Sequence, residues 1–257
     1  MKLAILGSGS RGNSIFLETD SIKLLIDAGF SGKKIEEQLK KIGEKIEDID
    51  GIFITHEHGD HIQGAGIISR KYEIPIYITK ESYEAGILKL GKLKNEHVRF
   101  IEGQFWVGDS AVYPFDVMHD AERTIGFRIE ESKGSKVAIA TDIGYIDNTV
   151  REAFKDVDVM IIESNYDYTT LMQCSYPWEL KSRVKGRNGH LSNTDAARFI
   201  REMYHPNLKK VFLAHMSKDS NDPKIAWDSV LDELIRNRIK LSLEIAHQDL
   251  CTEMIEF

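Results

Sequence analysis

The sequence predicts an α+β fold in which two mixed β-sheets pack face to face and helices cover both outer sides, a four-layer αββα sandwich. Five short apolar or β-branched runs follow one another in the middle of the chain without helices between them, which disfavours a parallel sheet wound with alternating helices. On both sides of this stretch, strands and amphipathic helices alternate. No linker, low-complexity tract or short repeat interrupts the pattern, so we expect one domain over residues 1–257.

The individual elements follow from hydrophobic periodicity. In the N-terminal part, strands are expected at 2–6, 15–18 and 22–26, and Ile35, Leu39 and Ile42 mark the first amphipathic helix. An apolar strand at 51–54, a helix at 65–70, a strand at 75–78 and a helix at 80–90 capped by Thr79 follow. The middle strands are expected at 98–101, 104–107, 111–118, 124–130 and 136–140. The C-terminal part is expected to contain helices at 147–154, 193–204 and 223–238 and strands at 159–163, 210–214, 241–246 and 251–256.

Size and composition are those of an ordinary globular protein, with 257 residues, 42% of them apolar and 29% charged, enough for a substantial core. The net charge of −7 disfavours a protein that coats nucleic acid through bulk charge, but it is compatible with a local basic strip. The apolar run after Met1 is too short for a signal peptide, and no segment reaches the length of a transmembrane helix, so no membrane association is expected. Cys174 and Cys251 lie far apart and outside any metal-like spacing, which predicts free thiols and a cytoplasmic location.

The most informative stretch is His56-Glu57-His58-Gly59-Asp60-His61, which directly follows the apolar run 51–54. Imidazole and carboxylate ligands together suit zinc or manganese, with iron as a further candidate. We expect Gly59 to let the backbone turn sharply, so that the ligands fold inward. His56 and His58 can reach one ion while Asp60 and His61 reach a second, and a site for two metals is suited to hydrolysis.

Three further candidates stand at the ends of predicted strands. His119 follows the strand 111–118, Asp142 follows 136–140 and His215 follows 210–214. A single histidine at a strand end is more often a hydrogen-bonded structural residue than a ligand. Because loops gather at one edge of a sandwich, the three residues together are candidates for the same metal site.

The histidine stretch resembles the H-x-H-x-D-H signature of the metallo-β-lactamase superfamily. The resemblance implies the αββα sandwich and two divalent metal ions at a catalytic centre that includes Asp60. It also implies a role for each ligand: His56, His58 and His119 for the first ion, Asp60, His61 and His215 for the second, and Asp142 as a bridge. Asp27 resembles an aspartate that supports the ligand loop by hydrogen bonds.

His190 stands in Gly189-His190-Leu191-Ser192, directly before a predicted helix. This element is similar to one in tRNase Z and related phosphodiesterases, in which a histidine protonates the leaving oxygen. The resemblance implies this catalytic role for His190, with Glu163 as the candidate that orients it. The alternative is that His190 is a structural residue at the entry of the helix.

A basic strip lies in the segment between 164 and 187 and consists of the alternating residues Lys181, Arg183, Lys185 and Arg187. Tyr176 and Trp178 precede it. Cations interleaved with aromatic rings can bind a phosphate backbone and stack bases, so we expect the strip to contact substrate. The alternative is a solvated basic loop that balances an acidic protein.

Motifs between residues 8 and 217, including the glycine-serine stretch 8–14, Thr141-Asp142-Ile143-Gly144 and Ala214-His215-Met216-Ser217, resemble the YycJ/WalJ group of metallo-hydrolases. The resemblance implies a phosphodiesterase that acts on DNA, an exonuclease in which a hydroxide held between the two ions attacks phosphorus. Two alternatives stay open. One is a small-molecule phosphodiesterase or thioesterase of the same fold. The other is a non-catalytic metal-binding regulatory scaffold, against which the complete ligand set argues. The sequence predicts no particular oligomeric state.

Overall fold

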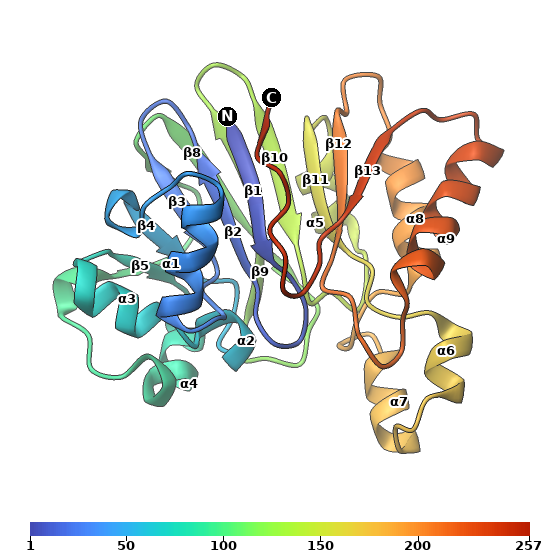
Figure 1. Cartoon of the computed structure of the whole chain (residues 1–257), viewed down its shortest axis with the longest axis horizontal. Helices are drawn as coiled ribbons and strands as arrows, with labels where there is room; N and C mark the ends of the chain where they lie inside the picture. Colours follow the sequence, from blue (N-terminus) through green and yellow to red (C-terminus); the bar gives the residue numbers. More distant parts are fainter.

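Two seven-stranded mixed sheets form the centre of the computed structural model, which describes residues 1–257 (Figure 1). In spatial order, the first sheet contains β14 (Ile255–Glu256), β1 (Lys2–Gly7), β2 (Ser14–Glu18), β3 (Lys23–Ile26), β4 (Gly51–Phe53), β5 (Ile76–Ile78) and β6 (Val98–Phe100). The second sheet contains β13 (Ser242–Ile245), β12 (Lys210–Ala214), β11 (Val159–Glu163), β10 (Lys136–Ala140), β9 (Thr124–Glu131), β8 (Ser110–Val117) and β7 (Phe105–Val107).

The two sheets follow the same pairing rule. Strands β1 to β3 pair antiparallel and β3 to β6 parallel, while β7 to β10 pair antiparallel and β10 to β13 parallel. The carboxyl ends of parallel strands meet at one edge of a sheet. The loops that follow β3 and β4 in one sheet and β10, β11 and β12 in the other are therefore brought together at one end of the sandwich.

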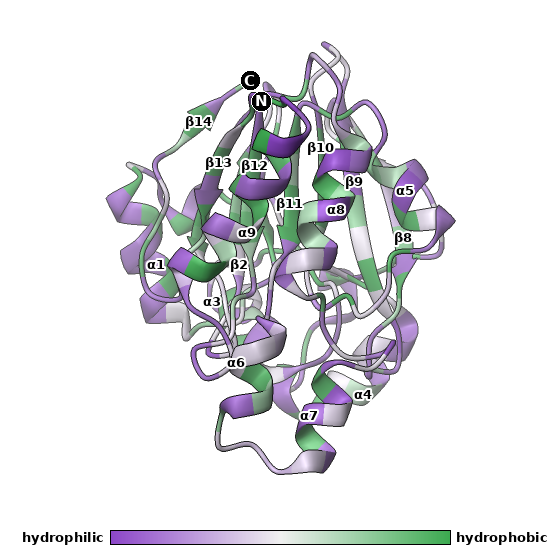
Figure 2. Ribbon diagram, turned by 90° about the vertical axis from the view of Figure 1, so that its right-hand side faces the viewer, coloured by the Kyte–Doolittle hydropathy of each residue, from purple (hydrophilic) through white to green (hydrophobic).

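Helices cover both outer faces (Figure 1). The first sheet is covered by α1 (Gly32–Lys41), α3 (Ala65–Tyr72) and α4 (Lys80–Leu90), and the second by α5 (Asn148–Phe154), α8 (Asn193–Met203) and α9 (Pro223–Arg236). Three short helices, α2 (Gly59–Ile62), α6 (Tyr168–Gln173) and α7 (Trp178–Val184), lie at the end opposite the chain termini (Figures 1 and 2). Two 3₁₀ turns, Ile46–Asp48 and Asn95–His97, complete the elements.

Three hydrophobic cores separate the four layers. The central core lies between the sheets and includes Leu3 and Ile5 from one sheet and Phe127 and Phe212 from the other. A second core fills the space between the first sheet and its helices, and a third lies between the second sheet and α5, α8 and α9. Because successive strand residues point to opposite faces, each sheet supplies side chains to two of these cores. The predicted αββα sandwich is confirmed.

Most predicted elements are confirmed within one or two residues, including the Thr79 cap, whose hydroxyl accepts from the Ser82 amide. The expected strand 251–256 is wrong over its first four residues, since only Ile255–Glu256 pair as a strand. There, Thr252 instead binds Ile5 through both its amide and its hydroxyl. Helices α6 and α7 have no counterpart among the predicted elements. No helix is long and apolar enough to cross a membrane. The expectation of one domain stays a prediction.

A candidate metal centre at the ends of the strands

The histidine stretch leaves β4 and enters α2, with His58 as the residue before the helix. The backbone turns at Gly59 into α2, as expected, but the turn does not require a glycine. Gly59 is the first residue of α2, its φ lies outside the left-handed region, and a Cβ there would meet nothing within 4 Å. The close approach occurs instead at Gly29, where a Cβ would lie 1.6 Å from the Asp60 carbonyl oxygen. A glycine at 29 therefore lets the loop after β3 pack against the ligand stretch.

Backbone strain is concentrated at this end of the sandwich. Three of the six non-glycine residues with positive φ are Asp27 (61°), Asp142 (56°) and His215 (51°), which follow β3, β10 and β12. The left-handed conformation costs a non-glycine residue on the order of 1–3 kcal/mol, and it persists where the surrounding structure enforces it. The strand ends thus hold these side chains in a conformation that a free loop would avoid.

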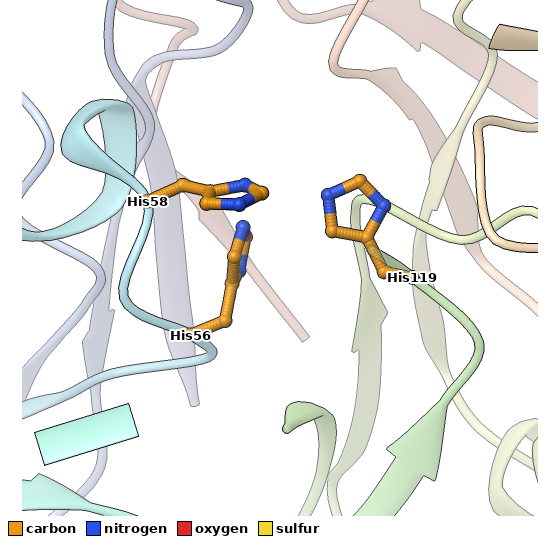
Figure 3. A group of neighbouring side chains, drawn as sticks. All are labelled: His56, His58 and His119. Atoms are coloured by element: carbon orange, nitrogen blue, oxygen red, sulfur yellow. The ribbon is translucent and has the colours of Figure 1, made fainter. Parts of the chain in front are cut away.

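The predicted ligands meet in three overlapping groups. The rings of His56 and His58, from one loop, and His119, from the end of β8 in the other sheet, face a common space (Figure 3). Their ligand atoms lie within 4.8 Å of one another. The same holds for the group of Asp60, His61 and His215, and for the group of His56, His61 and Asp142. The structure therefore brings all seven residues together, and each group could hold a divalent ion.

Four of these histidines share one arrangement, in which Nδ1 contacts a fixed oxygen and Nε2 is turned to the other side of the ring. The contacts of Nδ1 are His56 with Thr55 Oγ1 (3.0 Å), His61 with Asp27 Oδ2 (2.7 Å), His119 with the Gly189 carbonyl (3.1 Å) and His215 with Glu163 Oε1 (2.7 Å). A hydrogen bond at one ring nitrogen fixes the orientation of the imidazole and leaves the other nitrogen as a ligand.

Buried polar atoms of the ligand cluster indicate whether a metal ion fits between these side chains. His56 Nε2, His215 Nε2 and Asp142 Oδ2 are buried and form no well-aligned hydrogen bond, although His215 Nε2 lies 3.5 Å from Asp60 Oδ2 and Asp142 Oδ2 lies 3.0 Å from His61 Nε2. A buried polar atom without a partner costs about 1–3 kcal/mol, so such atoms are rare unless something else satisfies them. All three are lone-pair donors of the kind that zinc and manganese bind. The donor set therefore fits divalent ions.

The pKa shifts of the histidines in the ligand cluster also favour bound cations. Burial alone would lower the pKa of His215, but Asp142, Asp60 and Glu163 outweigh it and raise the pKa to about 10. His61 behaves similarly: burial opposes the shift, while Asp142 and Asp27 raise its pKa well above the usual value. The buried carboxylates thus create a field that strongly favours positive charge, which two dications would supply.

Glu163 joins two histidines at the edge of the cluster. Its Oε1 lies 2.9 Å from His190 Nδ1 and 2.7 Å from His215 Nδ1. Its Oε2 accepts the amides of Ile143 and Leu191, at 3.0 and 2.9 Å. One buried carboxylate therefore fixes the Asp142 loop and the His190 loop together. Geometry also groups His190 with Asp142, Glu163 and His215 as atoms that could hold an ion, so geometry alone leaves both roles open for His190.

Three residues without a predicted role also support the site. Thr55 donates its amide and hydroxyl to Asp27 and contacts two histidine rings. Asn13 donates its amide to the Asp60 carbonyl and places Nδ2 3.0 Å from His61 Nε2. Asn165 Nδ2 donates to the His215 carbonyl at 2.7 Å. The only sequence signal was their position beside the motifs, because apart from the contact of Thr55 with its neighbour His56 these contacts join separate segments of the chain.

Lys181 and Arg183 of the basic strip do not share one surface, because residues 178–184 are helical and positions two apart on a helix are separated by about 200° of rotation. Lys181 is buried, and its Nζ donates to the Met172 carbonyl at 2.7 Å, so the expectation that it contacts substrate does not fit this conformation. Arg183 pairs with Asp120, the residue after His119. Lys185 lies over the Trp178 ring at 5.0 Å and Arg187 over the Tyr145 ring at 4.0 Å.

With this geometry established, comparison with known proteins identifies the family. The model of the Beta-lactamase superfamily domain matches residues 23–216. The chain belongs to this superfamily. It is 36% identical to exodeoxyribonuclease WalJ of Streptococcus pneumoniae over 252 residues, which cover 96% of this chain and 93% of that protein. It is also 36% identical to exodeoxyribonuclease YycJ of Bacillus anthracis over 233 residues, or 90% and 88% of the two chains.

Among solved structures, the metallo-beta-lactamase fold protein YhfI of Bacillus subtilis superposes with a TM-score of 0.71 over 98% of this chain and 99% of its own, at 16% identity. That likeness concerns the fold alone. The predicted superfamily and the resemblance to the YycJ/WalJ group are confirmed.

Proposed function

We propose that this protein, a metal-dependent hydrolase of the beta-lactamase superfamily, is an exodeoxyribonuclease that cleaves phosphodiester bonds with two divalent ions. The observation that carries the proposal is the buried cluster in which the seven histidine and aspartate side chains meet, with the Nε2 of His56 left without a hydrogen-bond partner. Similarity over nearly the whole chain to proteins named exodeoxyribonucleases supports DNA as the substrate.

The ligands divide between two ions by their grouping. His56, His58 and His119 would hold one ion, and Asp60, His61 and His215 the other. Asp142 would lie between them, because it groups with His56 and His61, one member of each set. Bound there, the ions would supply an activated water at neutral pH and offset charge on the phosphate oxygens. Zinc and manganese fit this mixed set of imidazoles and carboxylates, and iron is the third candidate.

His190 would donate a proton to the departing sugar oxygen. Its Nδ1 contacts Glu163, which leaves Nε2 for the substrate, and its ring is 21% exposed at the edge of the cluster. Burial opposes protonation of the ring, but the charge of Glu163 and its hydrogen bond outweigh burial and raise the pKa of His190. Glu163 thus holds the ring in place and favours the form that carries the proton.

The DNA strand would approach along the segment 183–187. Arg183, Lys185 and Arg187 are exposed there, whereas Lys181 is not. Trp178 and Tyr168, 62% and 57% exposed, flank Lys185 and offer faces on which bases can stack. Because the net charge of the chain is −7, contact with phosphates must come from such local groups.

The test uses purified, metal-analysed protein with four substrates: end-labelled single-stranded DNA, end-labelled double-stranded DNA, a covalently closed DNA circle and a simple aryl phosphodiester. The proposal expects linear DNA to be shortened from an end while the circle resists. Cleavage of the aryl phosphodiester without degradation of DNA would support the small-molecule alternative instead. Stable metal binding with no hydrolysis of any substrate would support the regulatory scaffold.

A further inference from the structure

A polar pocket of about 210 Å³ lies beside the ligand cluster, under α7. His190 and His215 form the wall that it shares with the cluster. The opposite wall comes from α7, through Leu180, Arg183 and Val184. The remaining lining comes from the loops after β1, β8 and β12, from the end of β11, and from Tyr176 and Gly189 on either side of α7.

The lining of the pocket is rich in groups that both donate and accept hydrogen bonds. Ser10 and Ser217 supply hydroxyls, Tyr176 supplies a hydroxyl that donates to Asp219, and Asn165 supplies an amide that donates to the His215 carbonyl. This chemistry suits a sugar and its ester oxygens.

The charges around the pocket argue against a groove for a phosphate backbone. Arg183 is the only arginine or lysine in its lining, and the carboxylate of Asp120, which also lines the pocket, offsets its charge there. A surface that follows a nucleic-acid backbone instead carries several free cations. Leu180 and Val184 add an apolar side against which the carbon atoms of a sugar or the edge of a base can pack.

The volume of the pocket limits the size of the ligand that it can bind. The pocket volume of about 210 Å³ is below the roughly 300–1,000 Å³ that is usual for drug-sized ligands, so the pocket has room for at most one nucleotide unit and not for a run of strand. Resting on the exodeoxyribonuclease function proposed above, we propose that the pocket holds the terminal nucleotide of the DNA strand. Because His190 belongs both to the pocket wall and to the edge of the cluster, the bond between the terminal nucleotide and its neighbour then lies beside the candidate ligands.

The pocket can be filled from two sides in metal-loaded, full-length protein. Leu180→Trp adds bulk from α7, and Ser10→Tyr adds it from the loop after β1. Glu179→Trp is the matched control, because Glu179 neighbours Leu180 on α7 but is exposed and outside the lining. Circular dichroism establishes that each variant is folded, and Ser10→Tyr decides the question if Leu180→Trp does not fold.

The probes are deoxyadenosine monophosphate and inorganic phosphate, with binding measured by calorimetry. Both can bind the metals, but only the nucleotide can also use the pocket. Two or so extra hydrogen bonds at about 1 kcal/mol each predict that the wild-type protein binds the nucleotide about tenfold or more tightly than phosphate. This preference should fall to within about twofold in Leu180→Trp and Ser10→Tyr and persist in Glu179→Trp.

Two results would overturn the pocket assignment: equal affinity of the wild-type protein for nucleotide and phosphate, or a preference that survives in both filled variants. The lengths of the DNA cleavage products are a second measurement. If the pocket holds one nucleotide, the wild-type protein should release mononucleotides. Failure of the proposed function is distinguishable, because it would appear as absence of DNA cleavage by the wild-type protein. Binding of a mononucleotide, which requires no turnover, is measured independently of that result.

Discussion

The ligand cluster and the α6–α7 segment, two neighbouring regions, are built in opposite ways. In the cluster, the loops follow strands of two sheets, and Asp27, Thr55 and Glu163 fix the histidine rings from behind. In the α6–α7 segment, two short helices rest on a small core of Tyr166, Leu171 and Val184, and aromatic rings are exposed. The two sheets thus position the ligand cluster, while the α6–α7 segment is anchored by few buried residues and carries the exposed residues proposed to contact DNA. Substitutions in the two regions should therefore have different consequences.

The largest effect is expected from Asp142→Ala. Removing the carboxylate that lies between the two ligand groups should abolish hydrolysis, because one bridging anion offsets charge on both ions. Activity on linear DNA and metal content per chain are the measurements. Asp232→Ala, at an exposed position on α9, is the control and should behave as wild type. Wild-type turnover by Asp142→Ala would contradict the bridging role.

His190→Ala should slow turnover by about 10²–10⁴-fold, the usual loss for a general acid, and leave both ions bound. Metal analysis and single-turnover rates separate the two effects. His97→Ala serves as the control, because His97 belongs to none of the candidate ligand groups. Loss of an ion from His190→Ala would make this residue a ligand and would require the role of His215 to be revised.

Thr55→Val tests how the residues behind the ligand cluster support the histidine rings. The substitution keeps the shape of the buried side chain and removes its hydroxyl. That hydroxyl donates to Asp27 and contacts the His56 and His61 rings, so we expect about 10–100-fold weaker metal binding. Thr79→Val is a matched buried control. It removes the cap of α4 and should cost about 0.5–2 kcal/mol in unfolding free energy without changing metal affinity. Equal metal affinity in the two variants would show that the hydroxyl of Thr55 does not support the ligands.

The smallest effects are expected from the basic residues near α7. Replacing Arg183, Lys185 and Arg187 with alanine should make the salt dependence of single-stranded DNA binding shallower, by at most about 0.7 per lost contact. Lys181→Ala should leave this dependence unchanged and lower stability by about 1 kcal/mol, because its ammonium group binds the Met172 carbonyl. If Lys181→Ala made the salt dependence of DNA binding shallower and the other three substitutions did not, Lys181 and not the exposed residues would contact the DNA.

Features that depend on residues close in sequence could be predicted from the sequence, whereas features that depend on contacts between distant segments could not. The strands, the outer helices and the positions of His119, Asp142 and His215 at strand ends follow from short-range periodicity, and the structure agrees with them. The burial of Lys181 could not be predicted, because it depends on α7 packing against α6. The contact of Thr55 with Asp27 joins the ends of two neighbouring strands, and that of Asn13 with His61 joins loops 48 residues apart. The positive φ of Asp27 is likewise imposed by packing, since nothing in its local sequence demands a left-handed residue.

Metal-dependent anomalous diffraction from crystals of protein purified without chelator tests the central claim most directly. We expect two ions per chain. One should be bound by His56, His58 and His119 and the other by Asp60, His61 and His215, and Asp142 should contact both ions. Extraction with a chelator should remove both signals together with hydrolytic activity, and added zinc or manganese should restore them. A single ion, with Asp60, His61 and His215 all turned away from it, would contradict the two-metal centre.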